Sequence, residues 1–116
     1  MVKLNMIKIH IIRDKSGFIW QFEVKGHASY SKPGTEDIVC AAVSVTAFTA
    51  VGALDELAGL KECYREKDGY MLCSIPSDIS EDKKQTVRII LETTVVGFKQ
   101  IKMEYSKYVS VLEEEV

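Results

Sequence analysis

Residues 38–54 read IVCAAVSVTAFTAVGAL, a run of 17 positions without a charged side chain. Asp37 before the run suits a helix N-cap and Gly59 suits a helix end, so we predict a helix over residues 38–58. A helix that is apolar all round must be covered on more than one side. A membrane span needs about 20 apolar residues, and this run is shorter and contains Ser44, Thr46, Thr49 and Gly52. We therefore expect burial between a sheet and a second helix or a second subunit.

Two segments before this helix alternate between apolar and polar side chains. Residues 6–13 and 18–25 do so, which is typical of strands with one buried face, and residues 14–17 suit a hairpin loop. The predicted register pairs Ile7 with Val24, Ile9 with Phe22 and Ile11 with Trp20 on one face, and Lys8 with Glu23 and His10 with Gln21 on the other. We predict that the first face is buried and that the second, with His10, faces solvent.

A second hairpin is predicted by Asp68-Gly69, a strong two-residue turn signal, with strands over residues 61–67 and 70–76. Its register sets Cys63 opposite Ser74 and Cys73 opposite Tyr64. The two cysteines then point to opposite faces, so we predict that no disulfide joins them. Neither lies at a helix end that would acidify it, so we expect both thiols to be unreactive.

Helical spacing returns after Ser80, which opens a predicted helix over residues 81–104. Its core stripe consists of Val87, Ile90, Leu91, Thr94, Val95, Phe98 and Ile101. A last strand is predicted over residues 107–112, before an acidic tail of three glutamates. The order β-β-α-β-β-α-β predicts a two-layer α+β fold, with two helices packed on a largely antiparallel sheet.

Composition narrows the class of protein. The 116 residues suit one domain over residues 1–116, and 47% hydrophobic and 28% charged residues are ordinary for a soluble protein. A net charge of −2 argues against direct nucleic-acid binding. Two histidines and three scattered cysteines fit no metal spacing, so no metal or cofactor is expected. Lys3 and Lys8 interrupt any signal peptide, so a cytoplasmic protein without a membrane anchor is expected.

The candidate chemistry lies at His27 and Cys40. We expect Cys40 in the first turn of the predicted helix, where the positive helix end favours a thiolate and speeds alkylation. A thiolate and an imidazole within reach of it are the two groups that nucleophilic catalysis by a cysteine requires. The alternative is a small buried cysteine and an unrelated loop histidine. Asp37 could orient His27 and Ser44 could hydrogen-bond near Cys40, although capping and packing explain them equally well.

The segment between His27 and the helix is long for a connection in a small domain. It has little apolar surface to offset the entropy lost on ordering. We expect it to be mobile without substrate and to close over a bound peptide. This predicted substrate-gating loop contains Ser29, Tyr30, Ser31, Lys32, Pro33 and Gly34.

Two motifs carry a resemblance to a known family. Gly26-His27-Ala28, followed by DIVCAAVS over residues 37–44, resembles the ribosomal-processing cysteine proteases, called Prp. The resemblance covers nearly the whole chain. It implies a cytoplasmic, homodimeric bacterial endopeptidase that removes the N-terminal extension of a large-subunit ribosomal protein, the twenty-seventh in the usual count. It also implies that Cys40 is the nucleophile and His27 its partner in a dyad.

Two other functions fit the residues. A thiol-redox protein would use the same cysteine, but it needs a resolving cysteine nearby. A non-catalytic ribosome-assembly factor would not need His27, and its acidic charge would suit a basic ribosomal protein. Substitution of His27 separates these functions, because the protease depends on the imidazole.

Overall fold

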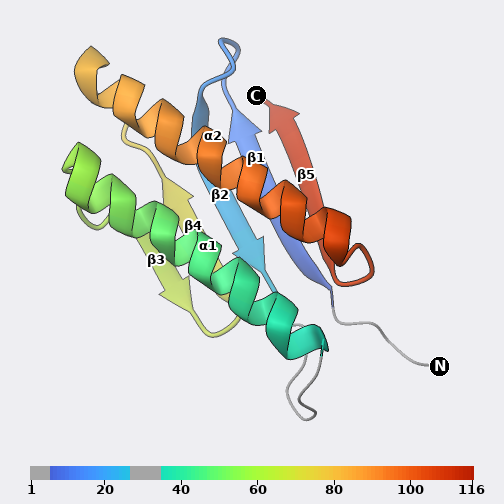
Figure 1. Cartoon of the computed structure of the whole chain (residues 1–116). Coiled ribbons are helices and arrows are strands. Elements are labelled where there is room, and N and C mark those ends of the chain that lie inside the picture. The colour runs from blue at the N-terminus through green and yellow to red at the C-terminus, as the bar shows by residue number, and fades with distance from the viewer. Residues whose placement is uncertain (1–5, 27–34) are drawn as a thin grey trace.

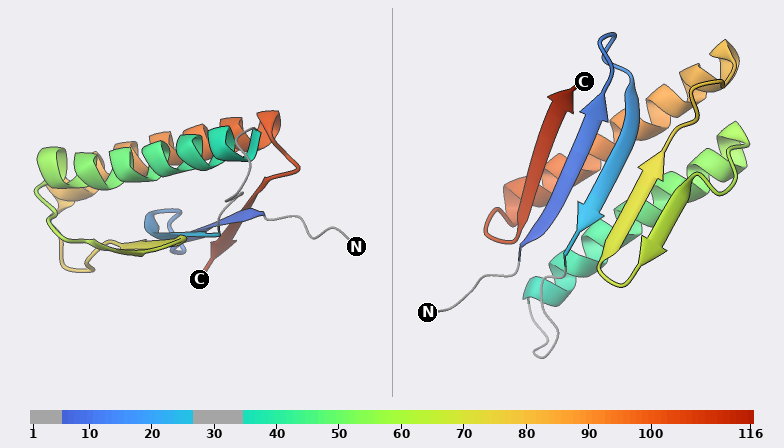
Figure 2. Two further views of the ribbon diagram at one scale, coloured as in Figure 1. Left: turned by 90° about the horizontal axis from the view of Figure 1, so that it is seen from below. Right: turned by 180° about the vertical axis from the view of Figure 1, so that it is seen from behind.

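The computed structural model describes residues 6–26 and 35–116, with the backbone alone described for residues 35–37. The elements are β1 (Ile7–Arg13), β2 (Ile19–Lys25), α1 (Thr35–Ala58), β3 (Tyr64–Lys67), β4 (Tyr70–Ser74), α2 (Glu81–Glu104) and β5 (Val109–Glu115). The sheet order is β3-β4-β2-β1-β5, and the β1–β5 pair is parallel while the others are antiparallel. Both helices lie side by side on one face of the sheet (Figures 1 and 2). The predicted α+β fold is confirmed.

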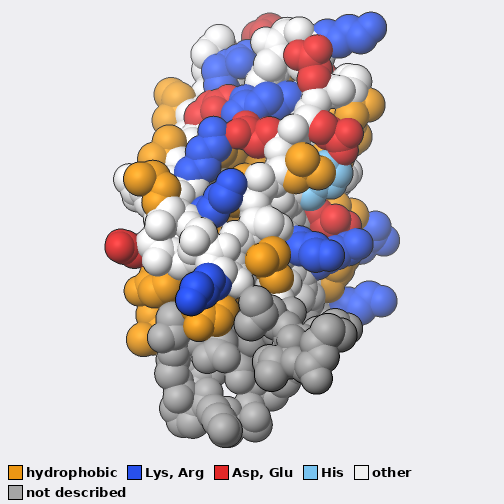
Figure 3. Space-filling model, turned by 90° about the vertical axis from the view of Figure 1, so that its right-hand side faces the viewer, with side chains coloured by type: hydrophobic (Ala, Val, Ile, Leu, Met, Phe, Trp, Pro, Cys, Tyr) orange, Lys and Arg blue, Asp and Glu red, His pale blue; other side chains and the backbone are white. Residues whose placement is uncertain are grey.

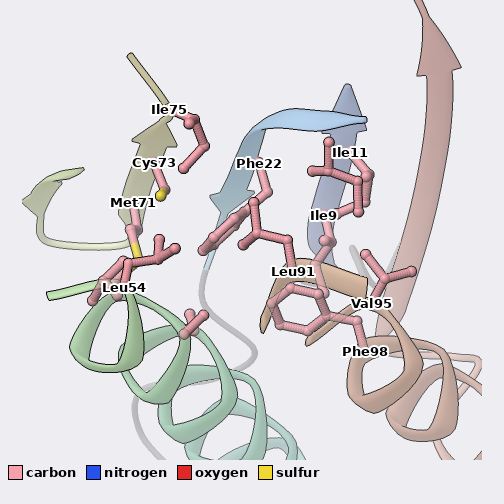
Figure 4. Close-up of a cluster of buried hydrophobic side chains, with 14 of the residues drawn as sticks. Ile9, Ile11, Phe22, Leu54, Met71, Cys73, Ile75, Leu91, Val95 and Phe98 are labelled. Carbon is pink, nitrogen blue, oxygen red and sulfur yellow. The ribbon is translucent and has the colours of Figure 1, made fainter. Parts of the chain in front are cut away.

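The core lies between the sheet and the helices (Figure 4). From β1 and β2 it receives Ile9, Ile11 and Phe22, and Phe22 meets Phe98 of α2 edge to face, with ring centroids 5.9 Å apart. The predicted stripe on α2 is confirmed: Val87, Leu91, Thr94, Val95 and Phe98 are buried. Ser80 caps this helix as predicted, because its side chain accepts a hydrogen bond from the Lys83 N–H at 3.3 Å.

Helix α1 is covered by the sheet and by α2, but not all round. The two helices approach closely where a Cβ on Gly97 would lie 3.3 Å from the Thr46 methyl group. Residues 38–58 have the length and hydropathy of a membrane span, with a mean hydropathy of 1.8. A core helix passes the same test, and the core side of α1 is buried at Val39, Val43, Ala47, Ala50, Val51, Leu54 and Ala58. Its opposite side leaves Ile38, Val45, Phe48 and Leu57 exposed.

The face of the sheet that the helices leave open carries polar pairs. His10 pairs with Glu114, and the Tyr70 hydroxyl donates to Glu23 at 2.7 Å. His10 is partly exposed, as predicted for a residue on the solvent face. Figure 3 shows Lys and Arg side chains interspersed with Asp and Glu on one side of the molecule.

The register of the first hairpin differs from the prediction. Ile9 pairs with Val24 and Ile11 with Phe22, two positions from the predicted partners, and a β-bulge interrupts the ladder between Ile12 and Arg13. The Asp14 carboxylate accepts hydrogen bonds from the Ser16 and Phe18 N–H groups and so folds the loop on itself. Because side chains alternate with period two, an even shift leaves Ile9, Ile11 and Phe22 on the predicted buried face. At the bulge the prediction fails, since Ile19 is buried and Trp20 is only partly buried.

The acidic tail is part of the sheet, which corrects the predicted end of the last strand. β5 runs to Glu115 because cations from other elements meet its carboxylates. Glu113 lies 3.0 Å from the Arg13 guanidinium of β1 and 2.7 Å from the Lys99 ammonium of α2. These two cations hold the pKa of Glu113 below its ordinary value, with the Lys99 hydrogen bond contributing most.

Candidate active site

Cys40 lines a pocket of about 190 Å³ between α1 and the β3–β4 hairpin. Helix α1 presents residues to it at helical spacing, because positions four and eight apart share one face. Cys40 is partly buried at this wall, and Ser44 lies one turn further along. The remaining lining residues are Val24, Gly26, Ala47, Phe48, Glu66, Lys67, Asp68, Gly69, Tyr70 and Met71.

Gly26, the residue before His27, is fixed at this pocket by its backbone. Its φ is +103°, in the region that glycine alone adopts readily, and its N–H donates to the Gly69 carbonyl at 2.8 Å. A Cβ here would lie 2.8 Å from the Met6 carbonyl oxygen. The chain therefore leaves β2 toward residue 27 at the pocket that Cys40 lines, although the two motifs are separate in the sequence.

We expect Gly26→Ala to destabilise the fold by about 1–3 kcal/mol, because the new Cβ meets backbone and the φ is strained. Cleavage should fall as well, since the same residue positions the start of the segment that carries His27. The measurement is denaturant unfolding together with peptide cleavage. Gly17→Ala is the matched control: its φ is +89° but a Cβ there meets nothing within 4 Å. If both variants lost the same stability and activity, the losses would come from the positive φ alone, and the close backbone contact at Gly26 would have no effect of its own.

The start of α1 differs from the prediction in a way that bears on Cys40. The helix begins at Thr35 rather than at residue 38, so Asp37 lies inside the first turn and is not the N-cap. Cys40 then lies in the second turn, where the helix-end charge has largely fallen off. Its N–H also belongs to the part of a helix that uses its own hydrogen bonds. The predicted placement of Cys40 in the first turn was wrong.

The structure describes only some of the other predicted site residues. Ser44 shares the pocket with Cys40. The side chain of Asp37 lies outside the described part, as do His27 and the predicted gating loop Ser29, Tyr30, Ser31, Lys32, Pro33 and Gly34. Among the described residues, no group of three or more His, Cys, Asp or Glu side chains could hold a metal ion.

Sequence reasoning missed the aromatic wall of the pocket. The Phe48 ring lies two turns beyond Cys40 and meets the Tyr64 ring edge to face, with centroids 6.4 Å apart. The hairpin turn at Asp68-Gly69 closes the opposite side with Tyr70. The sequence did carry a signal for the Phe48 wall: Cys40, Ser44 and Phe48 are spaced four residues apart, which puts them on one face of a helix.

The predicted separation of the other two cysteines was also wrong. The sulfur atoms of Cys63 and Cys73 lie 3.9 Å apart. β3 begins only at Tyr64, and Glu62 has a φ of 56°, so Cys63 does not follow the strand alternation. The Cys73 thiol hydrogen-bonds to Cys63 and lowers the pKa of the Cys63 thiol from 9.0 to about 7, against the opposing effect of burial. Preferential alkylation of Cys40 stays a prediction, and the lowered pKa of Cys63 makes Cys63 its competitor in that measurement.

Known proteins resemble this chain over most of its length. The family model described as cysteine protease Prp matches residues 6–110. The ribosomal processing cysteine protease Prp of Bacillus subtilis (strain 168) is 31% identical over 102 residues, which are 86% of this chain and 90% of that protein.

Solved structures share the fold. A crystal structure of a Streptococcus mutans protein matches with a TM-score of 0.80 and 31% identity, and the match covers 96% of each chain. The Prp protease of Staphylococcus aureus, solved in complex with a substrate peptide, matches with a TM-score of 0.79 at 23% identity over 94% of this chain and 100% of that one. The chain is a cysteine protease that belongs to the family of ribosomal processing proteases called Prp.

Proposed function

We propose that this protein cleaves the N-terminal extension from a large-subunit ribosomal protein, the twenty-seventh in the usual count, in the cytoplasm, with Cys40 as nucleophile and His27 as general base. One observation carries the assignment of residues. Cys40 and Gly26, the neighbour of His27, line the same pocket. A peptide substrate is supported by the Staphylococcus aureus relative, which was solved with a substrate peptide.

The proposed reaction has two steps. His27 takes the proton of the Cys40 thiol, and the sulfur attacks the scissile carbonyl carbon to form a thioester as the amine leaves. Water then attacks the thioester, with the imidazole as base, and frees Cys40. Preorganised N–H donors to the oxyanion are each worth about 2.7–4 kcal/mol where this has been measured. The unpaired N–H groups of the first turn of α1 are the helical candidates, since that of Cys40 lies beyond them.

The pocket suits one side chain of a peptide near the scissile bond. It holds about 190 Å³, and Ala47, Phe48 and Met71 give it apolar walls beside Cys40. Lys67 and Asp68 at the β3–β4 turn add polar groups at its rim. Apolar walls with a few polar groups are typical of sites that bind and orient a ligand.

The decisive experiment is incubation with the ribosomal protein that still carries its extension. We expect a shortened product by mass spectrometry, with one new N-terminus. A protein of unchanged length that nevertheless binds would favour the assembly-factor alternative. A substrate that gains or loses a disulfide but is not shortened would favour thiol-redox chemistry.

We further propose that a second copy of the chain covers the exposed side of α1. Val45 and Leu57 are 66% and 69% exposed there. A groove runs along this side, lined by Val45, Phe48, Gly52, Ala53 and Leu57 together with the polar Ser44, Thr49 and, at its end, Glu56. The uncharged run offers no charged group over residues 38–54 that would have to be desolvated in an interface. A twofold axis would set this side of α1 against itself.

Light scattering at micromolar concentration should therefore give about twice the chain mass of 13.0 kDa. We expect Val45→Lys to yield monomers, because it places a charge in the proposed interface. Ile89→Lys is the matched control, since Ile89 is 68% exposed on α2, outside that interface. A monomeric parent protein would refute the proposal, and a dimer broken only by Ile89→Lys would place the interface on α2.

A further inference from the structure

Cys63 and Cys73 form a thiol pair that the proposed peptidase reaction does not use. Their sulfur atoms are 3.9 Å apart, and both residues are free thiols. The pair lies apart from Cys40: Cys63 lines a different groove from the pocket that Cys40 lines. The pair is therefore a second group of nucleophilic side chains with its own access to solvent.

The end of α1 brings the two sulfurs together. After Gly59 the Leu60 N–H returns to the Leu54 carbonyl at 3.0 Å, and the left-handed Glu62 reverses the chain. Cys63 then enters beside β4 outside the regular ladder, with its carbonyl accepting from the Ser74 N–H at 2.9 Å. This irregular approach puts the Cys63 side chain on the face where Cys73 lies.

The two thiols differ in access, which gives them different roles. Cys63 is partly buried and lines an open groove of about 550 Å³. Cys73 is fully buried on β4 between Met71 and Ile75, with its sulfur on the helix side of the sheet (Figure 4). A small oxidant in the groove can therefore reach Cys63, whereas Cys73 can be reached through Cys63.

The surroundings of Cys63 favour its thiolate. The contact with the Cys73 thiol lowers the pKa of Cys63, and the same contact together with burial raises the pKa of Cys73. Asp55 on α1 opposes this effect on Cys63, but its carboxylate is paired with the Lys61 ammonium at 2.9 Å. The other charged residues lining the groove are Glu62 and Arg65.

We propose that Cys63 and Cys73 are a redox-active dithiol, which a low-molecular-weight disulfide oxidises to an intramolecular disulfide. The Cys63 thiolate attacks one sulfur of the oxidant, whose S–S bond breaks and releases one thiolate. Cys73 then gives its proton to solvent, and its sulfur attacks Cys63, which releases the second thiolate. The protein loses two electrons and two protons in total, and the oxidant becomes two thiols.

The geometry permits the second step with a small movement. A disulfide bond is about 2.05 Å long, so the sulfurs must close the remaining part of their 3.9 Å separation. Cys73 is held in the sheet by its pairing with Phe22 and Tyr64. Cys63 precedes β3 in an irregular segment, so it is the residue that moves.

The test uses oxidised glutathione on the full-length Cys40→Ala variant, in which Cys63 and Cys73 are the remaining cysteines. At pH 7 we expect both thiols to disappear without a retained glutathione adduct and with a mass lower by two hydrogens. Peptide mapping should link the fragments that contain Cys63 and Cys73, and dithiothreitol should restore both thiols. In the wild-type protein the same linked fragments should appear.

Two variants in this background assign the roles. With Cys63→Ser, the buried Cys73 should remain a free thiol. With Cys73→Ala, the reaction should stop at a glutathione adduct on Cys63. That adduct should form roughly fivefold more slowly at pH 7, because loss of the donor lowers the thiolate fraction more than it raises the nucleophilicity.

Three results would overturn the proposal: a disulfide between chains, a stable glutathione adduct on Cys63 while Cys73 is present, or two free thiols after prolonged exposure. Phenylarsine oxide, which needs two adjacent thiols, gives a readout without oxidation. It should block iodoacetamide labelling of Cys63 in the Cys40→Ala variant. Full iodoacetamide labelling of Cys63 in the presence of phenylarsine oxide would also contradict the proposed dithiol. This measurement does not need the Cys73→Ala variant, so it remains decisive if that variant fails to fold.

Discussion

Replacing Cys40 with alanine is expected to lower the rate of cleavage by roughly 10⁶-fold, the loss that accompanies removal of a covalent nucleophile in a protease. No other group at this wall of the pocket can form the thioester. The fold should persist, because alanine favours a helix and Cys40 lies inside α1. Single-turnover cleavage of the extended ribosomal protein, followed by mass spectrometry, measures the loss.

Cys63→Ser is the control for this change. Cys63 is also a free, partly buried thiol, but it lines another groove, so its substitution should leave cleavage at the parental rate. Circular dichroism and unfolding midpoints should show that both variants fold. If Cys40→Ala still cleaved and Cys63→Ser did not, the nucleophile would have been assigned to the wrong cysteine.

Replacing His27 with alanine should reduce cleavage by about 100-fold or more, the low end of general-base contributions. The effect should fall on kcat, because the imidazole acts on the Cys40 proton rather than on peptide binding. Rates over a series of substrate concentrations separate the effect on kcat from any effect on KM.

The protein contains its own control for this experiment, because it has two histidines. His10 lies on the open face of the sheet, where it pairs with Glu114. His10→Ala should therefore leave the rate of cleavage unchanged. Parental turnover in His27→Ala would contradict the dyad, because the imidazole would then not be the base that acts on Cys40.

Local signals in the sequence predicted most of the fold. The Asp68-Gly69 turn predicted the pairing of Lys67 with Tyr70 correctly, because a two-residue turn fixes the register of its own hairpin. The helical spacing after Ser80 predicted α2 at both ends. In the first hairpin the same reasoning gave the buried face of Ile9, Ile11 and Phe22 but the wrong partners, because the turn and the bulge each add one residue.

The start of α1 shows that a capping residue alone is a weak predictor of where a helix begins. Thr35, Glu36 and Asp37 all suit the first turn of a helix, so the residues after Gly34 offered more than one start. The earlier start moved Cys40 into the second turn and weakened the argument from the helix end. The assignment of Cys40 now rests on the shared pocket and on membership of the family.

The sequence by itself determined the order of the elements, the buried faces of β1 and α2, and the two residues proposed for the chemistry. These depend on short-range periodicity, turn residues and motifs, which the chain carries locally. Only the tertiary structure decided that Gly26 lies at the pocket of Cys40 and that Cys63 meets Cys73. Both contacts join residues distant along the chain through backbone with positive φ, at Gly26 and at Glu62. Such irregular dihedral angles redirect side chains by amounts that the alternation of residue types does not encode.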